Sequence, residues 1–171
     1  MPECTDDTKL NRKKTMYDIV KLIHLSAAIV WIGGMTFMLF ALCPAALTTL
    51  EAQPRARLMV AVMHRFFISV VVAVVLLFAT GTNLYTTGFR AVKAATGSGS
   101  VPLGWNVMLV LGLLMFVIFG HIYFAGFRKF KRAVAAETWP QAAAAAAQIH
   151  TLVVVNFSLG WLSIAAVRLL A

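Results

Sequence analysis

The chain has 171 residues, of which 61% are hydrophobic and 12% charged, and its mean hydropathy is +0.85. Soluble domains carry about 25% charged residues, so this composition argues against a soluble protein and indicates an integral membrane protein. The net charge is +9, but the basic residues cluster beside apolar runs. Such clusters are typical of contacts with lipid headgroups, so we expect the lipid bilayer as a partner and no nucleic acid.

The first segments in chain order are a polar tail and a long apolar span. Residues 1–15 carry charges of both signs and predict a flexible N-terminal tail, while residues 16–171 form the transmembrane domain. The first predicted span, about 17–43, exceeds the roughly 20 residues that cross a hydrocarbon core. It contains one histidine, His24, and an imidazole within a span indicates a functional site.

Three further apolar runs predict spans at about 58–86, 105–127 and 147–170. Residues 88–104 form the only stretch rich in Gly, Ser and Pro, which predicts a flexible loop. Four spans with short or moderate connections predict an all-α, antiparallel four-helix bundle with both termini on one side of the membrane.

Each span contains one histidine, and the alternating helix direction converts its position into a depth. His64, His121 and His150 are predicted toward the face opposite the termini, whereas His24 is predicted toward the terminal face. A bis-histidine heme needs two imidazoles at one depth on facing helices, so the sequence predicts heme b between two of the first three. His24 would then bind a second heme alone, and Arg65 is a candidate partner for the heme propionates.

The same layer of histidines also fits a copper site. Cys43, Met59 and Met63 are predicted near it, and thiolate, thioether and imidazole ligands together suit Cu(I). Trp31 is expected to wall a pocket. Methionine is also a common gap-filler in apolar cores, and histidines can be packed or interfacial side chains. A cofactor-free membrane assembly subunit therefore stays open as a third interpretation.

Several segments resemble a known group of membrane proteins. The first span, VKLIHLSAAIVWIGGMTF followed by a proline-alanine exit, resembles the first helix of small bacterial proteins of the copper-resistance D (CopD) type and of the related HemJ-type protoporphyrinogen oxidases. The segments HRFFISVVVAVVLLFATG, GHIYFAGFRKFKR and VVVNFSLGWLSIAAVRL of the later spans add to the resemblance, which covers nearly the whole membrane part.

This resemblance implies a bacterial inner-membrane location and either of two functions. CopD-type proteins are associated with copper uptake, and HemJ-type proteins bind heme b and oxidise protoporphyrinogen IX. The resemblance also implies that His24 is the functional histidine, with Trp31, Gly33 and Gly34 as its motif neighbours. The fourth span has AQIHTL where HemJ-type proteins have an Asn-Glu-x-Pro-like entry, which argues against protoporphyrinogen oxidation.

The leading prediction is a membrane heme b protein with intramembrane histidine ligands that acts in electron transfer or membrane redox chemistry. The alternative is copper transport or copper binding of the CopD type. If the protein is an enzyme, the resemblance implies a membrane oxidoreductase. A redox partner or a quinone, and a second copy of the chain, are the further partners that this function would involve.

Overall fold

Four long helical segments make up residues 3–170, which the computed structural model describes, with side chains from residue 11 onward. The first comprises α1 (Glu3–Phe37), the π-helical segment η1 (Met38–Leu42) and α2 (Cys43–Thr49). The second is α3 (Ala52–Thr96). The third comprises α4 (Leu103–His121), the π-helical segment η2 (Ile122–Phe127) and α5 (Arg128–Ala135), and the fourth is α6 (Trp139–Leu169). The described residues contain no strand, so the all-α prediction is confirmed.

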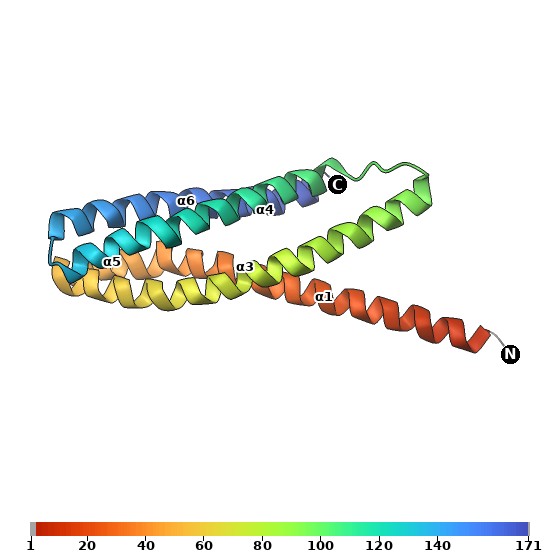
Figure 1. The fold of residues 1–171 in the computed structure, drawn as a ribbon, viewed down its shortest axis with the longest axis horizontal. Helices are drawn as coiled ribbons and strands as arrows, with labels where there is room; N and C mark the ends of the chain where they lie inside the picture. Colours follow the sequence, from red (N-terminus) through yellow and green to blue (C-terminus); the bar gives the residue numbers. More distant parts are fainter. Residues whose placement is uncertain (1–2, 171) are drawn as a thin grey trace.

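Each of the four segments is long and apolar enough to cross a membrane. Large apolar side chains cover their outer surface, with Ile29 70%, Val117 69% and Phe40 69% exposed. Exposing so much apolar surface to water is unfavourable, whereas lipid tails are as apolar as these side chains and solvate them well. The segments alternate in direction, and α1 begins at the end of the bundle where α6 finishes (Figure 1). The chain is therefore an integral membrane protein with an antiparallel four-helix bundle, as predicted.

The helices extend further than the apolar runs predicted. Helix α1 already begins at Glu3, so most of the predicted flexible tail is helical, and residues 1 and 2 lie outside the described residues. Helix α3 continues to Thr96, so only residues 97–102 of the predicted loop are non-helical. The reason is that residues 90–96 are mostly good helix formers, and the helix ends only where Gly97 adopts a φ of 70°.

A proline explains the irregular end of the first membrane segment. The predicted span ends just before Pro44, yet the chain stays helical to Thr49. Pro44 has no N–H for the preceding turn, and the Cys43 N–H bonds to the carbonyl of Met38, five residues back. The wider π-helical turn accommodates the break, so the helix continues beyond the proline.

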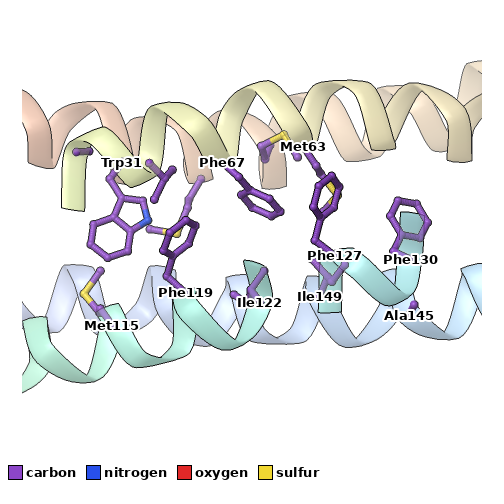
Figure 2. Packing of buried hydrophobic residues seen from close by; sticks show 14 of the residues in the cluster. Trp31, Met63, Phe67, Met115, Phe119, Ile122, Phe127, Phe130, Ala145 and Ile149 are labelled. Atoms are coloured by element: carbon purple, nitrogen blue, oxygen red, sulfur yellow. The ribbon is translucent and has the colours of Figure 1, made fainter. Parts of the chain in front are cut away.

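The core lies between two helix pairs. Helix α1 packs along α3, and α4 with η2 and α5 packs along α6. The pairs are close at the end with the α5–α6 turn and diverge toward the termini (Figure 1). Between them Trp31, Phe67, Phe119 and Ile149 interdigitate with the buried methionines (Figure 2). This packed core therefore occupies the half of the bundle opposite the termini.

Replacing Gly104 with Ala is expected to destabilise the protein by about 1–3 kcal/mol, measured by unfolding in mixed detergent micelles. A Cβ on Gly104 would collide with the backbone carbonyl of Ala166 on α6, and the Gly104 N–H donates to the carbonyl of Leu170 at 3.0 Å. The matched control is Gly112→Ala on the same helix, where an added Cβ meets nothing within 4 Å. Equal effects of the two variants would contradict the proposed close approach of α4 and α6.

Candidate functional site

His24 contacts α3 near the end of the bundle that carries the termini. Its Nδ1 lies 2.9 Å from the hydroxyl oxygen of Thr80, and its side chain is half-buried. Thr80 is itself buried, with 8% of its surface exposed. Two polar side chains on facing, otherwise apolar helices thus satisfy each other, as hydrogen-bonding groups within a membrane must.

The hydrogen bonds of Thr80 determine which nitrogen of His24 carries the proton. The Thr80 hydroxyl donates its single proton to the carbonyl oxygen of Leu76, one turn earlier on α3. Its oxygen can therefore only accept from His24, which makes Nδ1–H the donor. In the neutral ring the lone pair then lies on Nε2, which is the nitrogen that would be free to bind a metal.

Gly81 allows the imidazole to lie directly against the backbone of α3. A Cβ at position 81 would come within 3.2 Å of Cε1 of His24, which is closer than ordinary van der Waals contact. The ring is therefore positioned by Thr80 on one side and by the absence of a side chain at Gly81. Sequence analysis did not single out these two residues, although a Thr-Gly pair inside an apolar span is a signal that could have done so.

Trp31 lies two turns along α1 from His24 but belongs to the core. It is 3% exposed, stacks on Phe116 at a centroid distance of 5.7 Å and meets Phe119 edge-on at 6.0 Å. The side chain therefore fills space between the helix pairs (Figure 2). Its ring packs against two aromatic side chains of α4.

The predicted layer of three histidines does not converge. His64, His121 and His150 are all exposed, and the ring of His64 stacks on Phe127 at 6.3 Å. Arg65 is also exposed, on the surface of α3. Among the side chains that the structure describes, no group of three or more His, Cys, Asp or Glu could hold a metal ion.

Aromatic side chains occupy the interior at the depth of these histidines. Phe67, which is 2% exposed, lies 5.1 Å from Phe127, 5.8 Å from Phe119 and 6.1 Å from Tyr123 between ring centroids. Figure 2 shows Phe67 and Phe127 directed into the space between the helix pairs. The residues in this packing do not fit a heme held between two of the three histidines.

Four of the predicted copper ligands, by contrast, line one apolar groove. A cavity of about 450 Å³ between η1–α2, α3 and α6 is lined by Cys43, Met59, Met63 and His150, and also by Met38. We call these five residues the sulfur groove. Arg55 lines it too, although it was not predicted as a site residue. His64 and His121 do not line it.

The fold defines the chain as a four-helix integral membrane protein. Comparison with models of protein families, with curated proteins and with solved structures gives no match. The resemblance to CopD-type and HemJ-type proteins therefore stays a prediction that rests on the residues quoted above.

Proposed function

We propose that the protein is a heme b protein of a bacterial inner membrane in which Nε2 of His24 would bind the heme iron, and that it acts in electron transfer or membrane redox chemistry. The observation that carries this proposal is the hydrogen bond from Nδ1 of His24 to Thr80. In the neutral ring this bond leaves the lone pair on Nε2, and it fixes the orientation of the ring, which are two properties that a histidine ligand of heme needs.

The residues around His24 would each contribute a separate function. The hydroxyl oxygen of Thr80 accepts a hydrogen bond from Nδ1–H, and the missing side chain at Gly81 lets the ring lie against α3. Lys21, exposed and nearly one turn closer to the terminal face, is a cation available to a propionate. When bound, heme b supplies one-electron redox chemistry.

The proposal predicts a single histidine ligand from this chain. The other three histidines lie in the opposite half of the bundle, where they contact or neighbour the residues of the packed core. A heme held by His24 alone could also bind a small molecule or a substrate, which would favour chemistry at the heme over electron transfer alone.

Visible spectroscopy of the protein purified in mild detergent, together with metal analysis, tests the proposal. A Soret band with sharper α and β bands after reduction is the expected result. A colourless preparation that holds stoichiometric copper would instead support the copper alternative. If neither heme nor copper is present, even after the cells are supplied with both, a cofactor-free assembly subunit is the remaining interpretation.

The sulfur groove is the observation that favours the copper alternative. Thioether, thiol and imidazole side chains line one apolar cavity, and this set of donors suits Cu(I). The groove and the region of His24 lie at different ends of the bundle and share no residue. Copper bound in the groove would therefore be lost in Cys43→Ser protein and retained in His24→Ala protein, whereas heme would behave in the opposite way.

Thr80→Val is expected to weaken heme binding by about 10- to 100-fold without abolishing it. Valine has nearly the same shape, but it cannot accept a hydrogen bond from Nδ1–H of His24, so the ring loses both its fixed tautomer and its orientation. Heme titration of the apoprotein, followed by the Soret band, measures the change. Thr80→Ser should restore binding, since it keeps the hydroxyl.

Thr82→Val is the matched control for this substitution. Thr82 is exposed on the same helix, and its hydroxyl bonds only to the carbonyl of Phe78. An equal loss in Thr82→Val and Thr80→Val proteins would show that the effect comes from the helix rather than from His24.

A further inference from the structure

A basic pocket lies at the corner between the third and fourth membrane segments. Its volume is about 500 Å³, and η2, α5 and the start of α6 line it. Arg128, Lys129 and Arg132 supply three cations within little more than one helical turn, and Thr138 and Gln141 provide polar side chains at the start of α6. We call these five residues the basic pocket.

The positive charge of the basic pocket is not neutralised by a neighbour. None of the residues that line it is acidic. The nearest carboxylate along the chain, Glu137, is paired with Arg57 of α3 at 3.1 Å, which is the single ion pair among the described side chains. Three cations around one cavity therefore favour an anion, and the guanidinium fork of arginine matches phosphate oxygens.

The position of the pocket in the membrane indicates the source of that anion. Phe124, one turn before Arg128, is 60% exposed and belongs to the apolar surface that faces lipid. The guanidinium of Arg128 lies over its ring, 5.5 Å from the centroid. The pocket thus has an apolar floor on the bilayer side and cations on the headgroup side, which is the distribution of a phospholipid with its acyl chain below its phosphate.

We propose that the basic pocket binds the phosphodiester headgroup of one anionic phospholipid. Arg128 and Arg132 contact the phosphate, Lys129 adds a third charge, and an acyl chain runs along Phe124. A volume of about 500 Å³ is within the range of specific ligand sites and exceeds that needed for a phosphate ion alone. The basic pocket shares no lining residue with the sulfur groove and does not include His24, so the proposal does not rest on which cofactor the protein holds.

Native mass spectrometry of the full chain, released from nanodiscs of equal parts phosphatidylglycerol and phosphatidylcholine, tests this proposal. We expect one phosphatidylglycerol molecule to stay bound at a collision energy that removes phosphatidylcholine. In Arg128→Gln/Arg132→Gln protein its occupancy should fall about tenfold or more, since each removed cation weakens binding to anionic lipid. Arg90→Gln/Lys93→Gln is the matched control. It also removes two exposed cations, but from the C-terminal end of α3, which does not line the basic pocket.

Three results would overturn the proposal. One is equal retention of the two lipids, and another is equal loss of phosphatidylglycerol in both double variants. The third is displacement of the lipid by millimolar inorganic phosphate, which would show a site for a soluble anion. Arg128→Lys/Arg132→Lys protein keeps the charges, so retention there together with loss in the Gln variant excludes misfolding as the cause.

Discussion

Purified His24→Ala protein is expected to lack the Soret band, whereas His121→Ala protein should keep the wild-type spectrum. The reason is that His24 is the one imidazole that a hydrogen bond to a buried partner positions, while His121 is exposed on α4. In the proposed function, this substitution would remove the single side chain that binds the heme iron. The measurement is the heme content per protein, from the spectrum of the reduced protein and a heme extraction assay.

Two controls separate loss of the ligand from loss of the fold. Size-exclusion profiles of the wild type and of the His24→Ala protein should coincide. Added imidazole should restore part of the Soret band, because it can occupy the space that the side chain leaves. A spectrum that survives in His24→Ala but disappears in His64→Ala or His150→Ala would show that the heme site lies in the opposite half of the bundle.

Phe67→Ala is expected to give the largest loss of stability of any single substitution discussed, about 3 kcal/mol. The side chain is 2% exposed and lies within about 6 Å of three other aromatic rings that hold the two helix pairs together. Lipid tails are as apolar as the core, so the loss of stability comes mainly from lost packing contacts and from the cavity. We therefore expect a value in the lower part of the range measured for replacing a buried phenylalanine with alanine.

Unfolding in mixed micelles with increasing dodecyl sulfate measures this loss. Phe78→Ala is the matched control on the same helix, since Phe78 is 58% exposed. It should change the free energy of unfolding by less than about 1 kcal/mol. Similar losses in the two variants would mean that Phe67 faces lipid, and would contradict the arrangement of the core in Figure 2.

The existence of four spans could be predicted because a bilayer imposes a length and a composition on each of them. Their ends could not, because a helix continues past its apolar part as long as the residues favour it. Residues 90–96 continue α3, and only Gly97 ends it. Pro44 likewise does not end the first segment, because a π-helical turn accommodates it.

The depth of each histidine in the membrane could be predicted, but the side of the helix on which it lies could not. In a membrane bundle the side chains facing lipid and those facing the core are both apolar, so the sequence does not show which way a helix is rotated. For this reason the sequence predicted His64, His121 and His150 in one shared layer, whereas the structure exposes all three. The resemblance of the first span to known proteins indicated His24, but only the structure supplied its partner Thr80.

The π-helical segment η2 has a consequence for every residue that follows it in the third membrane segment. A π-helical turn accommodates one extra residue, and one residue corresponds to about 100° around an α-helix. On α5, Phe130 is 2% exposed and points into the bundle, while Arg128 and Arg132 are exposed. Without the extra residue, α5 would be rotated about its axis by about 100°, and Phe130 would no longer point into the core. The number of residues between 122 and 127, more than their identity, therefore sets which side of α5 faces the membrane surface.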